Sequence, residues 1–299
     1  MSRRRARRAK IMIAVVGATG NTGRAVVKEL KQLGHDPICV VRNPDKAREV
    51  LDPDAKIAVA ELTDRPALEK AFKGVTSIFV VTSHNPNMVE QQNNVLDAAL
   101  EAGVQYLVRV SGSRFLIVPD SPSIIGRGHY AIEDRLRGSG MKWVMLRPGL
   151  FMQNTFAQAA AIKNDSKIVL PFAADLPLAF IDVRDTGAVG ARVVLDPVPH
   201  LGKIYEFTGA LSNFAEFADV FSEVLGRRIT YVAVTAEQAE QGMKARGMPD
   251  WLITHQLTAA QVAAKGGLST ERTEPICNIV HRAPISTKQF VEDHKKVFS

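Results

Sequence analysis

Three glycines stand at intervals of three residues near the start of the chain, at Gly17, Gly20 and Gly23. They follow an apolar run, residues 11–16, and open a segment of helical periodicity, residues 22–33. Glycine lets the backbone turn tightly and a ligand approach it closely, and a helix N-terminus attracts anions. This context predicts a seat for a dinucleotide pyrophosphate. We expect the seat to consist of Gly17, Ala18, Thr19, Gly20, Asn21, Thr22 and Gly23. A valine at Gly17 is expected to abolish binding and leave the fold largely intact.

The residue that ends the second expected strand, residues 37–41, bears on the choice of dinucleotide. An acidic side chain there binds the ribose 2′-hydroxyl of NAD, whereas an arginine accommodates the 2′-phosphate of NADP. The chain places Arg42 at this point, with Lys46 four residues later as a second cation. A guanidinium suits a bidentate contact to phosphate. The sequence therefore predicts that NADP(H) is preferred over NAD(H).

Polar residues also follow later strands of the expected sheet. Glu61 and Leu62 come after residues 56–60, and Thr82 and Ser83 come after residues 77–81, where the adenine and the ribose should pass. Ser111 ends the fifth strand, where it either contacts nicotinamide or substrate or caps the strand end. Other chemistry has little support. The seven histidines form no pair with metal-ligand spacing, and no Gly-x-Ser-x-Gly motif occurs, so no metal is expected.

The elements that position these residues alternate between short apolar runs and amphipathic segments. Expected strands cover residues 11–16, 37–41, 56–60, 77–81, 105–110 and 142–146, and helices lie between them at 22–33, 65–72, 88–102 and 125–138. This alternation is typical of βαβ units. It predicts an α/β fold: a Rossmann-type, doubly wound parallel sheet with a smaller, mainly helical C-terminal lobe.

Three parts of the chain are expected. Residues 1–10 form a flexible basic arm, residues 11–153 an NAD(P)-binding Rossmann domain, and residues 154–299 a smaller substrate lobe. Within the last part, a helix at 180–195 and a strand at 203–208 should return to the main sheet. We expect another helix at 151–163 and one further strand, at 229–234.

Charge and composition limit the classes of partner. The net charge of +7 resembles that of a nucleic-acid-binding protein, but six of the 38 basic residues lie in the arm, which leaves 32 against 31 acidic residues. Nucleic acid is therefore an improbable partner. No apolar stretch is long enough to span a bilayer. No membrane partner is therefore expected. Cys39 and Cys277 are expected to be reduced thiols, which indicates a cytoplasmic protein. No oligomeric state is predicted.

The motifs together resemble those of the NmrA-like proteins, atypical members of the short-chain dehydrogenase/reductase superfamily. The resemblance covers nearly the whole chain. It is carried by residues 15–23 and 41–46, by Leu146-Arg147-Pro148-Gly149, by residues 181–185, and by Tyr205-x-Phe207-Thr208-Gly209. It implies a bound dinucleotide on the glycine loop and Arg42, with the nicotinamide near Thr82, Ser111, His129, Gly149 and Phe151.

The resemblance also identifies the catalytic candidates. Alignment on Glu133 puts Ile125 and His129 where the superfamily carries its Tyr-x-x-x-Lys pair. The other tyrosine nearby, Tyr130, is followed four residues later by Asp134, which supplies no cation to lower a phenol pKa. Histidine in place of the lysine occurs among the family's quinone and dye reductases, so His129 is the catalytic candidate, together with Ser111. Alternatively, His129 only binds a ribose or lies on a helix surface.

These features predict an NAD(P)H-dependent oxidoreductase that transfers hydride from NADPH to a quinone-like or other aromatic acceptor, a small-molecule substrate. The family also contains proteins that bind the dinucleotide without turnover. The alternative is therefore a non-catalytic, redox-sensing regulator that binds NADP(H).

Overall fold

The computed structural model describes residues 11–268 and 272–299, so the expected arm, residues 1–10, lies outside the described residues. A seven-stranded sheet with the order β10-β6-β5-β4-β1-β2-β3 forms the centre, and all its pairings are parallel. Its strands are β1 (Ile13–Val16), β2 (Ile38–Val41), β3 (Lys56–Val59), β4 (Ser77–Val80), β5 (Tyr106–Val110), β6 (Lys142–Pro148) and β10 (Ile204–Phe207). The expected Rossmann-type sheet is confirmed.

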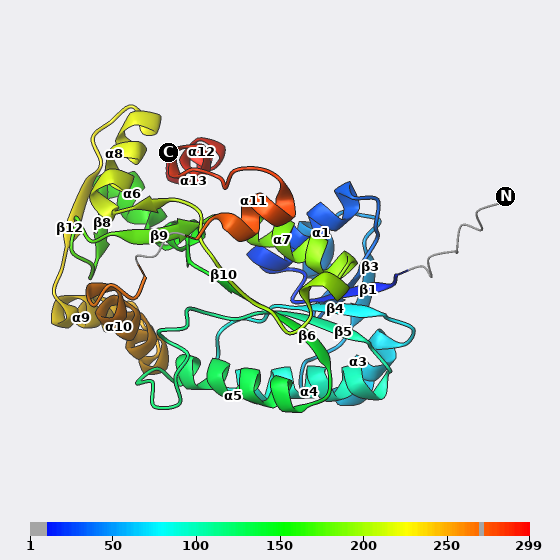
Figure 1. Cartoon of the computed structure of the whole chain (residues 1–299). Helices are drawn as coiled ribbons and strands as arrows, with labels where there is room; N and C mark the ends of the chain where they lie inside the picture. The colour runs from blue at the N-terminus through cyan, green and yellow to red at the C-terminus, as the bar shows by residue number, and fades with distance from the viewer. Residues whose placement is uncertain (1–10, 269–271) are drawn as a thin grey trace.

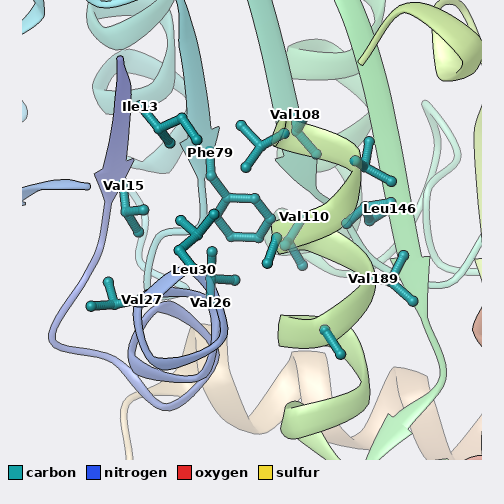
Figure 2. Packing of buried hydrophobic residues seen from close by; sticks show 14 of the residues in the cluster. Ile13, Val15, Val26, Val27, Leu30, Phe79, Val108, Val110, Leu146 and Val189 are labelled. Atoms are coloured by element: carbon teal, nitrogen blue, oxygen red, sulfur yellow. The ribbon is translucent and has the colours of Figure 1, made fainter. Parts of the chain in front are cut away.

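Helices cover both faces of this sheet (Figure 1). One layer contains α1 (Asn21–Gln32), α7 (Val183–Leu195) and α11 (Glu274–Val280); the other contains α3 (Arg65–Phe72), α4 (Met88–Glu101) and α5 (Ile124–Gly138). A short helix, α2 (Pro44–Val50), follows β2. Each layer has its own buried core, because successive side chains of a strand point to opposite faces. In Figure 2, Phe79 of β4 lies in the first core with Leu30 of α1 and Val110 of β5 around it.

Helix α7 and strand β10 belong to the main sheet layer although they lie late in the chain. β10 pairs with β6, and α7 packs against α1. The expected helix at 180–195 begins too early, because Phe180 and Ile181 belong to a strand, β9 (Leu178–Ile181). Asp182 then caps α7 by accepting a hydrogen bond from the Arg184 amide, 2.8 Å away.

The C-terminal lobe lies at the end of the sheet opposite the N-terminus, at the left of Figure 1. It contains α6 (Ala159–Asp165), α8 (Phe214–Leu225), α9 (Ala236–Ala245), α10 (Asp250–Ala264), α12 (Thr287–Asp293) and α13 (Lys295–Phe298). Phenylalanines form much of its core, including Phe180, Phe217, Phe221 and Phe290. Across the described ranges, no helix has the length and apolar character needed to cross a membrane.

The lobe holds more strands than the sequence predicts. Besides β12 (Thr230–Ala233), the expected strand, it has β7 (Leu150–Phe151), β8 (Lys167–Leu170), β9 and β11 (Leu211–Ser212). The expected helix at 151–163 is also wrong at its start, where a 3-10 helix, Met152–Gln158, precedes α6. Short apolar runs of two to four residues carry too little periodicity to be recognised, and their partners decide them: β8 pairs with β12, and β7 with β9.

Candidate active site

Two of the loop glycines are required by the protein's own packing. Gly17 has a positive φ of 81°, and a Cβ there would lie 1.8 Å from the Val81 carbonyl oxygen. A Cβ on Gly23 would lie 2.1 Å from the Gly17 carbonyl oxygen. The expectation that valine at Gly17 leaves the fold intact is therefore wrong, because the substitution would displace β4 from the loop.

Gly20 differs, because its nearest neighbour to an added Cβ is the Gly17 oxygen at an ordinary 3.5 Å. It is exposed and is the N-cap of α1, with extended backbone and no side-chain cap. The first turn holds no acidic residue. The amides of Asn21, Thr22 and Gly23 belong to the free first turn of the helix. A dinucleotide pyrophosphate fits here, since the space beside Gly20 is open and uncapped donors face it.

The other loop residues have distinct surroundings. Ala18 is fully buried in the core between the sheet and α1, and Thr22 is also buried. Thr19 is half-buried and Asn21 is exposed, with its Oδ1 accepting a hydrogen bond from Arg24 at 2.8 Å. Ala18 therefore contributes through packing and backbone, whereas Asn21 lies at the surface of the loop.

Arg42 lies at the end of β2 and Lys46 in the first turn of α2, and both are exposed. Asn43 caps α2 by accepting hydrogen bonds from the amides of Asp45 and Lys46, each at 3.0 Å. Asp45 pairs with Arg48 at 3.2 Å, so this carboxylate is already engaged. Within the described part of the chain, neither Arg42 nor Lys46 forms a salt bridge. Both cations are therefore available to an anion beside β2.

The residues expected near adenine and ribose follow β3 and β4. Glu61 is exposed, and the carbonyl of Leu62 accepts a hydrogen bond from Asn94 at 3.1 Å. Ser83 is exposed, while the hydroxyl oxygen of Thr82 accepts a hydrogen bond from the Gln92 side-chain amide at 2.8 Å. Because Thr82 accepts that bond, its own hydroxyl proton is free to be donated elsewhere.

Arg109 of β5 is the centre of a buried polar network that the sequence analysis missed. Its side chain is only 1% exposed. Its Nε donates to Gln92 at 2.6 Å, its Nη2 donates to His129 Nδ1 at 2.7 Å, and its Nη1 is a buried nitrogen without a hydrogen-bond partner among the described residues. Burial lowers the pKa of Arg109 to about 10, and Glu133 opposes this effect. The guanidinium therefore stays charged at neutral pH.

This contact determines the tautomer of His129. Arginine can only donate, so Nδ1 of His129 accepts and its proton lies on Nε2. Burial, and then the charge of Arg109, hold the pKa of His129 well below its ordinary value, so the ring is neutral. Its Nε2 lies 3.3 Å from Nε2 of His84, which therefore accepts from it. His84 is exposed to solvent, whereas His129 is buried.

His255 of α10 extends this group of rings into the lobe. Its ring meets His84 edge-on at 5.1 Å between centroids, and its Nδ1 lies 2.9 Å from the Ser123 hydroxyl. Burial, assisted by His84, lowers the pKa of His255 to about 4. No group of three or more His, Cys, Asp or Glu side chains in residues 11–268 and 272–299 could hold a metal ion. The three histidines therefore form a group of edge-to-face rings, in which a hydrogen bond joins His129 and His84.

Ser111 is engaged by Glu133 of α5 rather than directed at open space. Its hydroxyl donates to Glu133 at 2.7 Å. Arg147 binds the same carboxylate through two contacts, at 2.6 and 3.0 Å. Although burial alone would raise it, these hydrogen bonds lower the pKa of Glu133. The hydroxyl proton of Ser111 is thus directed at Glu133, and the lone pairs of its oxygen can accept a hydrogen bond.

A tyrosine-type proton donor does not face the sheet from α5. Ile125 is fully buried and packs with Met88 and Ile132. Tyr130 is 37% exposed, and Asp134, four residues later, is also exposed. Both lie away from the buried His129 on the same helix. The arrangement agrees with the interpretation that the superfamily's catalytic phenol is replaced in this chain.

A recess opens beside this network, at the carboxyl ends of β5, β6 and β10. It is a half-open recess with a cavity volume of about 50 Å³. Its wall includes Gly149, one of the residues expected near nicotinamide, while Phe151 is half-buried against the core below. The charged and aromatic residues of the wall are Arg114, Phe115, Arg147, Glu206 and Arg272.

One of the missed residues carries a signal that sequence analysis can use. Arg109 interrupts the apolar run Tyr-Leu-Val-Arg-Val, and a charge within a central parallel strand needs buried partners. His84 directly follows Thr82 and Ser83 at a strand end. His255 carries no such signal, because only the packing of α10 on α5 brings it to the site.

The model of the NmrA-like family matches residues 9–267. The chain belongs to the NmrA-like family. It is 37% identical to the NAD(P)H azoreductase of Xenophilus azovorans, over 81% of this chain and 83% of the relative. It is 29% identical to quinone oxidoreductase 2 of Escherichia coli, over 86% of this chain and 90% of the relative. The family expected from the sequence is confirmed.

Solved structures of related proteins share this fold. The crystal structure of the NADPH-dependent quinone oxidoreductase of Escherichia coli complexed with NADPH matches with a TM-score of 0.83 and 26% identity, over 95% of this chain and all of that chain. The NmrA transcriptional regulator in complex with NADP matches with a TM-score of 0.78 at 20% identity, which shows a shared fold. These relatives agree with the expected NAD(P)H-dependent oxidoreductase.

Proposed function

We propose that this protein is an NAD(P)H-dependent oxidoreductase that binds NADPH in preference to NADH and reduces a quinone-like aromatic acceptor. The observation that carries the choice of acceptor is the buried Ile125 in place of a catalytic phenol, beside a neutral His129. The reduced nicotinamide supplies a hydride when bound. The protein's own residues must then hold the acceptor and provide the proton.

The cofactor contacts follow from the strand ends. The loop Gly17–Gly23 would hold the pyrophosphate through its backbone, and Arg42 with Lys46 would hold a 2′-phosphate. Glu61, Leu62, Thr82 and Ser83 would line the adenine and ribose. Gly149 and Phe151 would lie beside the nicotinamide. A parallel sheet supports this order, because all its carboxyl ends meet along one edge.

The proton requirement selects the acceptor. Reduction of an ordinary ketone produces an alkoxide that needs a well-placed strong donor, whereas a reduced quinone is a delocalised phenolate that water or an imidazole can protonate. His84 is the exposed histidine of the three. The Nε2–H of His129 donates a hydrogen bond to Nε2 of His84 and so orients the His84 ring. We infer that His129 orients His84, and that His84 donates its Nδ1 proton to the reduced acceptor and regains one from solvent. Ser111 would act through Glu133 or accept a hydrogen bond from the acceptor.

The test is the loss of NADPH absorbance with menadione and with cyclohexanone. Menadione should be consumed and cyclohexanone should not.

His129→Ala and His84→Ala should each lower quinone turnover moderately, by about tenfold, which is the low end of what general acid–base groups contribute. His35→Ala is the control, because His35 is exposed at the end of α1, far along the chain from these rings. Ketone reduction that depends on Tyr130 would contradict the mechanism, and tight NADPH binding with no quinone consumed would favour the regulatory alternative.

We also propose that the protein acts in the cytoplasm. Cys39 is buried and Cys277 is exposed, and both are free thiols. Unpaired cysteines suit a reducing compartment. Mass spectrometry of thiols alkylated at the moment of cell lysis tests this: both cysteines should be found reduced.

A further inference from the structure

The recess beside Gly149 carries more positive than negative charge. Three arginines line it, Arg114, Arg147 and Arg272, against one carboxylate among its lining residues, Glu206. Arg147 is already held by the buried Glu133 through its short contacts of 2.6 and 3.0 Å. Among the described residues, Arg114 and Arg272 form salt bridges only with Glu206.

The distances to Glu206 show how loosely these two arginines are held. Nη1 of Arg114 lies 3.4 Å, and Nε of Arg272 lies 3.8 Å, from the same Oε2 atom of Glu206. Charge-assisted hydrogen bonds are about 2.7–2.9 Å long. One carboxylate oxygen cannot satisfy two guanidinium groups at these distances, and their side chains are 45% and 39% exposed. Counting the contacts within residues 11–268 and 272–299, most of their N–H donors are therefore available to another anion.

Backbone hydrogen bonds hold Arg272 at the rim, and a ring contact positions the side chain of Arg114. Arg272 is fixed to the end of β10, because its amide donates to the Thr208 hydroxyl at 2.7 Å and its carbonyl accepts from the Thr208 amide at 2.8 Å. Arg114 lies over the ring of Phe115, 4.7 Å from its centroid. Phe115 lines the same recess and is 42% exposed. An aromatic surface and two loosely paired guanidiniums thus share one opening.

This anion site is distinct from the expected cofactor phosphates. In the sheet order, β6 lies three strands from β1 and β10 lies five strands from β2. With neighbouring strands about 4.8 Å apart, the recess is roughly 14 Å or more from the glycine loop and farther from Arg42. The anion that it suits therefore belongs to another molecule.

We propose that Arg114 and Arg272 form a subsite for an oxyanion substituent, a carboxylate, sulfonate or phosphate, carried by the aromatic acceptor, whose ring lies against Phe115. That the bound molecule is reduced rests on the proposed function. That an aromatic oxyanion binds in the recess does not rest on it, so the two can be tested apart.

The experiment is calorimetry on the full chain loaded with NADP⁺, using naphthalene-2-sulfonate and its neutral counterpart naphthalene-2-sulfonamide as probes. We expect the sulfonate to bind about tenfold tighter, as the loss of a charge-assisted hydrogen bond implies. Arg114→Gln and Arg272→Gln should each weaken sulfonate binding about fivefold or more and change sulfonamide binding by less than about twofold. Arg228→Gln is the matched control, an exposed arginine of the lobe between α8 and β12.

Three outcomes would overturn the subsite: equal affinity for the two probes, no binding of either, or an equal loss in the Arg228→Gln protein. Turnover of 1,2-naphthoquinone and its 4-sulfonate then separates the two proposals. Reduction of both quinones without the calorimetric contrast removes the subsite and leaves the reductase. The contrast without reduction of either quinone supports the subsite and contradicts the proposed reaction.

Discussion

The two ends of the candidate site are built in different ways. At the phosphate end, the loop Gly17–Gly23 and Arg42 lie within 26 residues of one another, and the backbone supplies most of the donors. At the acceptor end, Arg109, His129 and His255 come from β5, α5 and α10, and side chains supply the chemistry. The phosphate end depends on local geometry, whereas the acceptor end depends on packing between distant segments.

This difference determines how each end should respond to change. A helix N-terminus with an open glycine works through backbone amides that do not titrate. The acceptor end relies on neutral histidines and on a guanidinium whose charge is buried. The phosphate end should therefore be sensitive to shape, and the acceptor end should be sensitive to pH and to the removal of single partners.

The largest effect is expected from Gly20→Val. The added side chain meets no protein atom closer than an ordinary contact at Cβ, but it occupies the space beside the free amides of α1. Affinity for NADPH and NADH, measured by calorimetry, should fall about 100-fold or more, because several charge-assisted hydrogen bonds are lost together. The melting temperature should stay within a few degrees of wild type. Gly138→Val is the control, since a Cβ there meets nothing within 4 Å. Unchanged NADPH affinity would place the pyrophosphate elsewhere.

A smaller and selective effect is expected from Arg42→Ala. Loss of a guanidinium contact to the 2′-phosphate should weaken NADP(H) binding by roughly 1.5–3 kcal/mol, tenfold or more, and leave NAD(H) almost unchanged. Arg48→Ala serves as the control, because Arg48 lies six residues later, on α2, and pairs with Asp45. The measurement is calorimetric titration with both cofactors. An equal loss for the two would contradict the assignment of Arg42.

The acceptor end should make the fold less stable in acid. The pKa of His255 is lowered to about 4 from its ordinary 6.5. Below pH 6.5 the unfolded chain gains a proton that the folded chain does not, so stability is complete above about pH 6.5 and is lost as pH falls toward 4. Between pH 7 and pH 5 this loss should be on the order of 1–2 kcal/mol.

His255→Asn should remove this part of the pH dependence, as measured by urea unfolding at both pH values. His129 acts in the same direction, since burial, and then the charge of Arg109, lowers its pKa. The exposed His35→Asn should leave the dependence as in wild type. The same slope in His255→Asn and wild type would show that His255 is protonated as easily in the folded chain as in the unfolded one.

The smallest effect is expected from Tyr130→Phe. This ring is 37% exposed on α5 and lies away from the buried His129. Quinone turnover should stay within about twofold of wild type, since a surface substitution away from the site changes free energies by less than about 0.5 kcal/mol. The measurement is kcat and KM for menadione. A large decrease in kcat would show that a tyrosine relay operates after all.

Much of the fold could be predicted because its pattern is local. Most strands of the main sheet are largely apolar runs followed by a helical pattern, and some of these helices have a side-chain cap, as Asn43 and Asp64 show for α2 and α3. The lobe was less predictable. Strand β8 is four residues long and gains its identity from pairing with β12, more than 60 residues later.

The sequence by itself determined the glycine loop, its strand and helix, and the family to which the chain belongs. These depend on neighbouring residues and on the conformations that glycine alone allows. The tertiary structure decided that Gly17 serves packing while Gly20 is open to a ligand, that burial and then Arg109 lower the pKa of His129, and that Arg114 and Arg272 share one recess. Each of these facts depends on burial and on distances between segments far apart in the chain, and both arise only when the segments pack together.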